Sequence, residues 1–303
     1  MGSGIAHVAA MAGYNVILTD ISEEALDKSL AGIAKNMARR LRKGQRTIAA
    51  KNTELQLGSN QDILRQEIVE LEAAQERLQQ ENATALQRIR TSTLLTEHAN
   101  AQLVIEAATE NVGLKYKIFQ QLAEATSAET ILCSNTSSIS ITAIAAHTDR
   151  PDRVMGMHFM NPVPVMKLVE LIRGLATSSE TYSIVDEVCQ RMGKTTVEGR
   201  DMPGFIVNRV LMPYINEAVQ ALYEDIGSVQ DIDTAMKLGT NVPMGPLQLA
   251  DFIGLDTCLS IMEVLNDGFA DSKYRPSPLL RKYVEAGWLG RKSGRGFYDY
   301  SKK

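Results

Sequence analysis

Short apolar runs alternate with helical patterns over roughly the first two thirds of the chain. The runs that predict strands are rich in β-branched residues, and they lie at 14–20, 101–108, 130–134, 153–159 and 194–198. Between them, apolar residues at helical spacing predict helices at 1–13, 22–43, 112–125 and 178–192. Because uninterrupted apolar strands belong to sheets covered on both faces, the alternation predicts an α/β fold with a doubly wound, mostly parallel sheet.

Beyond Met202-Pro203-Gly204, which is a turn signal, only helical periodicity remains. We expect helices at 205–226, 229–238, 247–266 and 279–286. The sequence therefore predicts an α/β domain over 1–200 and an all-helical domain over 201–303. The second domain carries apolar faces, such as Val210 with Leu211 and Leu222, that must be covered.

The stretch 45–92 is dominated by Gln, Glu and Ala and carries a short heptad pattern. Leu64, Leu71 and Leu78 recur every seventh residue, and Ile68 fills one intervening position, while polar residues hold the next two, Gln75 and Asn82. This pattern favours an elongated helical hairpin spanning about 22–92. A partner-binding arm is the alternative.

Composition narrows the function classes. The net charge of −4, from 32 basic and 36 acidic residues, argues against a nucleic-acid binder but leaves room for a local anion site. The 3 cysteines are scattered, which suits a reducing compartment, and they lack metal-ligand spacing. No apolar run reaches the ~18–20 residues needed to cross a bilayer, and we expect no membrane partner and a cytoplasmic protein.

The strongest candidate chemistry lies at the end of the strand 153–159. Pro162 cannot donate to a sheet ladder, so the strand stops there and His158 lies at its carboxyl end, where open α/β sheets bind ligands. If 165–172 is a neighbouring strand, Glu170 can reach the imidazole. A carboxylate on one ring nitrogen leaves the other free to take a proton. The alternative is a buried histidine satisfied by a backbone group.

The N-terminal segment reads as the later part of a dinucleotide-binding unit. A helix of small residues closed by Gly13 is followed by a strand that ends in Asp20. An acid at that position accepts hydrogen bonds from the adenosine ribose and disfavours the extra phosphate of NADP. A turn residue or helix cap is the alternative for Asp20.

Several motifs resemble those of the 3-hydroxyacyl-CoA dehydrogenase family, especially its short bacterial 3-hydroxybutyryl-CoA branch. The likeness runs from residue 1 to about 43 and from about 93 to the end, in the family's order. The motifs are His158-Phe-Met-Asn-Pro with Pro164-Val-Met-Lys-Leu-Val-Glu170, Ser134-Asn-Thr-Ser-Ser138, Pro203-Gly-Phe-Ile-Val-Asn208-Arg, Ala235-Met-Lys-Leu-Gly, and Gly290-Arg-Lys-Ser-Gly-Arg-Gly-Phe-Tyr.

The resemblance implies NAD as the cofactor and assigns roles to particular positions. The implied catalytic residues are His158, Glu170, Ser137 and Asn208. Those implied to contact the cofactor are Gly2, Asp20, Glu110, Lys115, Asn135, Ser137, Asn161 and Lys292. Those implied to contact the substrate are Ser137, Asn208, Asn36 and Lys43; Asn36 stands where some members have serine. Taken singly, most of these polar residues are also ordinary helix caps or surface charges. No metal is expected.

One part of the dinucleotide fingerprint is absent from the sequence. In the family, this region of the sequence begins with a strand and a Gly-x-Gly turn. The present sequence starts only at the third glycine of that motif, which corresponds to Gly2. Either the start is set too late or the protein is truncated. If the sequence is literal, we expect a Rossmann-type sheet without its central first strand and a severe loss of cofactor affinity.

The resulting expectation is an NAD-dependent oxidation of (3S)-3-hydroxyacyl-CoA, with 3-hydroxybutyryl-CoA as the substrate and a homodimer formed through the C-terminal helices. Stereochemistry, thioester and dimer follow from the resemblance alone. Two other hypotheses stay open, namely a dehydrogenase of a free hydroxy acid and a truncated, non-catalytic binding or assembly protein.

Overall fold

The computed structural model describes residues 1–57 and 61–301, which form two compact units. Unit 1 comprises 1–136 and 141–198, and unit 2 comprises 137–140 and 199–303. Nowhere in these ranges is a helix both long and apolar enough to cross a membrane. The assignment of cofactor binding to the first domain and substrate binding to the second stays a prediction.

The strands of unit 1 form two sheets. β1 (Val16–Thr19) pairs in parallel with β2 (Ile89–Ser92). The second sheet has the order β3-β4-β5-β6-β7, formed by Leu103–Glu106, Ile131–Ser134, Val154–Phe159, Leu168–Arg173 and Thr195–Arg200. Among the described residues no strand pairs with both β1 and β3, the position that the first strand of a dinucleotide-binding sheet occupies.

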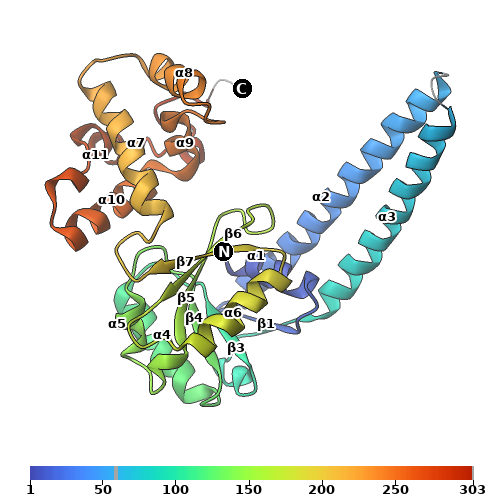
Figure 1. The fold of residues 1–303 in the computed structure, drawn as a ribbon, viewed down its shortest axis with the longest axis horizontal. Coiled ribbons are helices and arrows are strands. Elements are labelled where there is room, and N and C mark those ends of the chain that lie inside the picture. The colour runs from blue at the N-terminus through green and yellow to red at the C-terminus, as the bar shows by residue number, and fades with distance from the viewer. Residues whose placement is uncertain (58–60, 302–303) are drawn as a thin grey trace. The chain divides into compact units, whose positions relative to one another are not determined.

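Helices cover both faces of the larger sheet, as expected for a doubly wound fold (Figure 1). On one face Ile5 of α1 (Gly2–Met11) and Val185 of α6 (Ser179–Arg191) pack on Met155 and Met157 of β5. Gly156 lies on the other face, where a Cβ would come within 3.0 Å of Ile141 in α5 (Ile141–Ala145). His158 shares that face, because side chains alternate along a strand. α4 (Val112–Ala125) packs beside α5.

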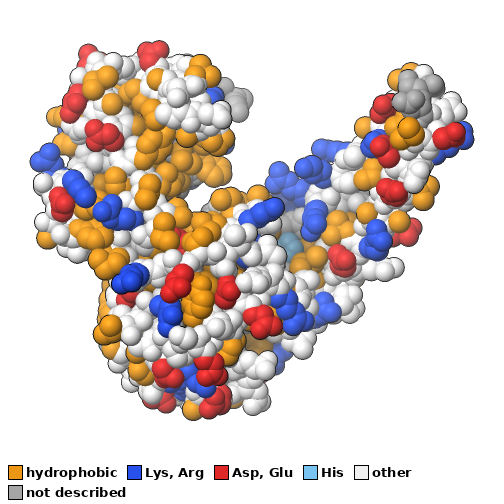
Figure 2. All heavy atoms as spheres, in the orientation of Figure 1, with side chains coloured by type: hydrophobic (Ala, Val, Ile, Leu, Met, Phe, Trp, Pro, Cys, Tyr) orange, Lys and Arg blue, Asp and Glu red, His pale blue; other side chains and the backbone are white. Residues whose placement is uncertain are grey.

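A long helical hairpin connects β1 to β2. α2 (Glu23–Gln56) and α3 (Gln61–Gln87) run side by side, and Lys and Arg side chains gather along them (Figures 1 and 2). Leu64 and Ile68 of the heptad pattern are buried. Gln75, at a polar heptad position, donates from Nε2 to the Leu41 carbonyl at 2.6 Å, which explains why an amide is accepted there. Residues 58–60, inside the predicted hairpin, lie outside the described residues.

Two details of this region differ from the prediction. The helix expected to end near residue 43 continues to Gln56. Gly44, which could have ended it, stays helical where α2 packs against the Gln75 side chain of α3. The segment 45–92 also contains β2, which the sequence did not predict. All of its four residues except Ile89 are polar, and they are extended because they pair with β1.

Among the described residues of unit 2 that follow β7, the long regular elements are all helices. Its helices are α7 (Val207–Tyr223), α8 (Val229–Gly239), α9 (Pro246–Ile253), α10 (Leu255–Phe269) and α11 (Pro278–Glu285). The single helix predicted over 247–266 is wrong. Gly254 adopts a φ of 106°, which is open to glycine but strained for other residues, and it separates α9 from α10. The apolar faces of α7 and α10 meet in one core, although Val210 is 68% exposed.

Within residues 1–57 and 61–301, short 3₁₀ turns also occur, at Leu95–His98, Pro151–Arg153, Ser272–Tyr274 and Arg291–Ser293. The last belongs to a C-terminal tail held on α9 by Asp251. The carboxylate of Asp251 accepts hydrogen bonds from the backbone N–H groups of Phe297 and Tyr298, each at 2.9 Å. The tail that carries Lys292 is therefore fixed within unit 2.

Candidate active site

His158 and Glu170 face each other across two neighbouring strands. β6 runs antiparallel to β5, and the register places the two residues directly opposite one another. Nδ1 of His158 lies 2.7 Å from Oε2 of Glu170. The histidine is 6% exposed and the glutamate is 0% exposed. The strand begins at Leu168 rather than at residue 165, but the shorter strand still includes Glu170.

This pair has the chemistry of a general base. A buried carboxylate that accepts from the Nδ1–H of an imidazole fixes the tautomer and leaves Nε2 as the proton acceptor. The same carboxylate then stabilises the imidazolium that forms. Residues with opposite partners in an antiparallel ladder have little freedom to separate, so the orientation of the ring is set before any ligand binds.

Asn135 ties the neighbouring strand to this pair. Its Oδ1 accepts a hydrogen bond from the backbone N–H of Phe159 at 2.9 Å, and its own N–H donates to the Glu106 carbonyl at 2.7 Å. The turn after β4 is thereby fixed between β3 and β5. In this structure the Asn135 side chain orients the backbone beside His158, and its predicted contact with the cofactor stays a prediction.

Glu110 and Lys115, both predicted to contact the cofactor, lie together at the end of β3. Lys115 is 1% exposed, and its ammonium lies 2.7 Å from Oε1 of Glu106 and 3.5 Å from Oε2 of Glu110. Glu106 also accepts from the Ser134 hydroxyl at 2.6 Å. The ammonium therefore neutralises the buried carboxylate of Glu106, and the hydroxyl adds a hydrogen bond to it.

Glu106 is a residue that the sequence analysis missed. The signal was present, because an acid that ends an apolar strand has to be paired if the strand is central. The identity of its partner could not be predicted from the local pattern, since the ammonium that neutralises it comes from the next helix.

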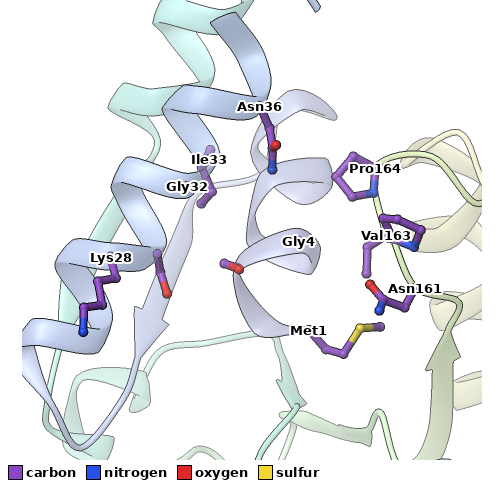
Figure 3. Close-up of a pocket in the computed structure, with 12 residues that line it drawn as sticks. Met1, Gly4, Lys28, Gly32, Ile33, Asn36, Asn161, Val163 and Pro164 are labelled. Carbon is purple, nitrogen blue, oxygen red and sulfur yellow. The ribbon is translucent and has the colours of Figure 1, made fainter. Parts of the chain in front are cut away.

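A pocket of about 310 Å³ opens beside the start of α1 (Figure 3). Its walls come from α1, from α2 and from the loop that follows β5. Asn36 and Asn161, predicted to contact the substrate and the cofactor, line opposite walls, and Gly4 lies between them. Gly2 precedes this wall in the first turn of α1. Lys43, two helical turns further along α2, is not among the lining residues.

The remaining predicted positions lie at the end of β1 and in unit 2. Asp20 is exposed directly after β1, and its Oδ1 accepts from the N–H of Ser22. Asn208 is 8% exposed, and its Nδ2 lies 3.4 Å from the Ser137 carbonyl. Lys292 is paired with Asp256.

The thiols are structural. Burial raises the pKa of Cys189 and Cys258 to about 12, so both are neutral, poorly nucleophilic thiols at ordinary pH. Burial likewise raises the pKa of Cys133. In the part of the chain that the structure describes, no three His, Cys, Asp or Glu residues are grouped to hold a metal ion.

Comparison with known proteins places these features in a family. Residues 1–202 match the model of the NAD binding domain of 3-hydroxyacyl-CoA dehydrogenase, and residues 204–300 match that of its C-terminal domain. A 3-hydroxybutyryl-CoA dehydrogenase of Bradyrhizobium diazoefficiens is 52% identical over 99% of this chain and 92% of its own length. One from Clostridioides difficile is 43% identical over 100% of this chain and 96% of its own length.

A solved structure gives the same result. The crystal structure of (S)-3-hydroxybutyryl-CoA dehydrogenase from Ralstonia eutropha superposes with a TM-score of 0.87 at 47% identity. The match covers 100% of this chain and 96% of that one.

Proposed function

Since the chain belongs to the 3-hydroxyacyl-CoA dehydrogenase family, we propose that it oxidises (3S)-3-hydroxybutyryl-CoA to the 3-oxoacyl-CoA with NAD as its cofactor. The observation that carries the proposal is the buried hydrogen bond of 2.7 Å between His158 and Glu170. The oxidation removes a hydroxyl proton and a hydride from the same substrate, so the protein has to supply a positioned base.

In the proposed reaction, Nε2 of His158 takes the proton of the C3 hydroxyl group and returns it when the reaction runs in reverse. Glu170 keeps Nε2 as the acceptor and stabilises the imidazolium. NAD supplies the hydride acceptor when bound. We assign to Ser137 and Asn208 the positioning of the reacting oxygen, an electrostatic role that such polar groups perform in many active sites.

The residues of unit 1 fit a dinucleotide. An exposed carboxylate, Asp20, directly follows β1, which is where adenosine ribose hydroxyls are bound in folds of this class. Gly2 lies in the first turn of α1, where the helix dipole favours phosphate, and Asn161 adds an amide to the pocket beside it. We propose that these three residues hold NAD, with Glu110, Lys115, Asn135 and Lys292 as further contacts.

We also propose that the coenzyme A portion of the substrate is bound beside α2. Asn36 lines the pocket, and an exposed basic cluster lies around it on the same helix, formed by Lys35, Arg39, Arg40, Arg42 and Lys43. Basic side chains of this kind suit the phosphate groups of coenzyme A. Lys43→Met should raise the KM for the thioester about tenfold. Lys117→Met, the same change on exposed α4, is the matched control.

The test of the function is a comparison of substrates. We expect rapid NAD reduction with (3S)-3-hydroxybutyryl-CoA and little with free 3-hydroxybutyrate. A preference for the free acid would favour the hydroxy acid dehydrogenase hypothesis. A folded protein that binds no NADH in calorimetric titration would favour the non-catalytic hypothesis.

A homodimer through unit 2 is the proposed assembly. Large apolar side chains of this unit are exposed, among them Leu238 at 82%, Ile226 at 72% and Phe252 at 52%. A second copy would remove such surface from water. Sedimentation or light scattering should give a dimer mass, and a monomer at micromolar concentration would contradict the proposal. The cytoplasmic location stays a prediction.

A further inference from the structure

Lys194 is a buried cation that the proposed mechanism does not use. It stands between α6 and β7 and is 9% exposed. Burial lowers its pKa, the direction expected when an ammonium is kept from water. Such a group persists in a folded protein only where hydrogen bonds offset the cost. The groups that accept hydrogen bonds from the Lys194 ammonium therefore indicate its structural role.

Both acceptors of the ammonium belong to the loop between β5 and β6. Nζ donates to the Val163 carbonyl at 2.5 Å and to the Met166 carbonyl at 2.8 Å. Among the ion pairs of the described residues, none joins Lys194 to a carboxylate. Its charge is directed to the main chain of this loop. The next residue continues the contact, because the N–H of Thr195 donates to the Lys167 carbonyl at 2.8 Å.

This loop lines the pocket and also connects the two strands that carry His158 and Glu170. It joins the strand that ends in Phe159 to the one that carries Glu170, and its residues 161–164 line the pocket (Figure 3). The fit against α1 is tight, since a Cβ on Gly4 would lie 3.0 Å from the Cβ of Val163. A shift of the Val163 backbone therefore moves one wall of the pocket toward or away from α1.

The surroundings of Lys194 contain two other titratable groups. His7 of α1 is buried, and its pKa is lowered by burial and then by the nearby charges of Arg40 and Lys194. Cys189 of α6 is a neutral thiol whose pKa is raised to about 12 by burial. Neither group supplies a negative charge at neutral pH, so the two loop carbonyls are the groups that stabilise the ammonium.

We propose that Lys194 is a positioning residue for cofactor binding, which holds the β5–β6 loop against α1 and so fixes the pocket wall that carries Asn161. The proposal rests on the proposed function, in which Asn161 contacts the dinucleotide from that wall. The ladder between β5 and β6 pairs five residues on each strand, including His158 with Glu170, so the dyad keeps its geometry without the lysine. Loss of the ammonium should therefore act on affinity more than on turnover.

Lys194→Met tests this, because methionine keeps an apolar side chain and removes the donor. We expect the Kd for NADH, measured by titration, to rise about tenfold, while kcat at saturating NAD changes less than about threefold. Lys167→Met, an exposed lysine in the same loop, is the matched control and should behave as wild type. Lys194→Arg restores a charged donor and should recover most of the affinity.

Hydrogen exchange provides a second measurement that needs no cofactor. The N–H groups of Val165 and Met166 both donate to the Pro162 carbonyl at 3.0 Å, and they should exchange faster in Lys194→Met than in Lys167→Met. Unchanged exchange and unchanged NADH affinity in Lys194→Met would overturn the proposal, and so would a loss of kcat at unchanged affinity. If Lys194→Met does not fold, Lys194→Gln decides by the same criteria. If the wild type binds no NADH, the proposed function fails, and the exchange rates alone decide whether Lys194 holds the loop.

Discussion

Replacing Glu170 by Gln tests the general base directly. The substitution keeps the size of the side chain and removes one charge at a position that is 0% exposed and 2.7 Å from the His158 ring. A hydrogen bond to a charged group contributes about 1.5–3 kcal/mol. At about 1.4 kcal/mol per tenfold, losing this contribution from the transition state lowers kcat by roughly 10- to 150-fold.

The amide adds a second effect. Its NH₂ group can turn toward Nδ1, which would leave the proton on Nε2, the nitrogen that has to accept it. We therefore expect kcat to fall on the order of 10² or more, at the upper end of the range. The affinity for NADH should stay within about twofold, because the substitution alters only the pair that relays the proton.

The assay is the initial rate of NADH formation from (3S)-3-hydroxybutyryl-CoA, together with a titration of NADH. Glu180→Gln, which removes the same charge from an exposed position in the first turn of α6, is the matched control. Turnover of Glu170→Gln within about threefold of the control would refute the assigned role. So would a fall in turnover that is matched by an equal loss of NADH affinity.

Three further predictions follow from the described residues. Asn208→Ala should lower kcat on the order of 10² in the same assay, and an unchanged kcat would remove Asn208 from the positioning role. Glu106→Ala leaves the Lys115 ammonium buried without its main partner, and urea denaturation should show a loss of about 3–5 kcal/mol in stability; a loss below about 1 kcal/mol would contradict this account. For Cys189 and Cys258 the folded pKa of about 12 exceeds the reference value of 9.0, so their stabilising contribution is complete below about pH 9 and is lost as the pH rises through about 12. A thiol reagent at about pH 8 should therefore label them slowly in the native protein and at once after unfolding, and fast native labelling would contradict their burial.

The parts of the fold that could be predicted are those that short stretches of sequence determine. The strand carrying His158 was recognisable because an apolar run stops at an Asn-Pro turn, and α6 because Ser178 begins an amphipathic helix as its cap. The doubly wound arrangement followed from the alternation of such segments.

The parts that could not be predicted depend on distant contacts. The extended conformation of β2 comes from its pairing with β1, which lies far earlier in the chain, as in the pair of Val16 with Ile89. Gly254 divides two helices although the apolar period continues across it, because its backbone conformation is set by the packing of unit 2. The burial of Lys115 and Lys194 was also hidden, since lysine is mostly exposed and the acceptors of these two lie on other elements.

The direction of β6 explains why one short loop both joins the strands of the His158–Glu170 pair and lines the pocket. A parallel strand after β5 would need a crossover of about a dozen or more residues, and its carboxyl end would lie at the edge where His158 lies. β6 instead turns back directly, so its first residues lie at that edge and Glu170 falls opposite His158. The connection must then cross the edge where ligands bind in such sheets, and there it lines the pocket with Asn161. The reversal of one strand therefore places the acid, the base and a wall of the pocket on a single β-hairpin, and a substitution that moves its loop should change binding before it changes chemistry.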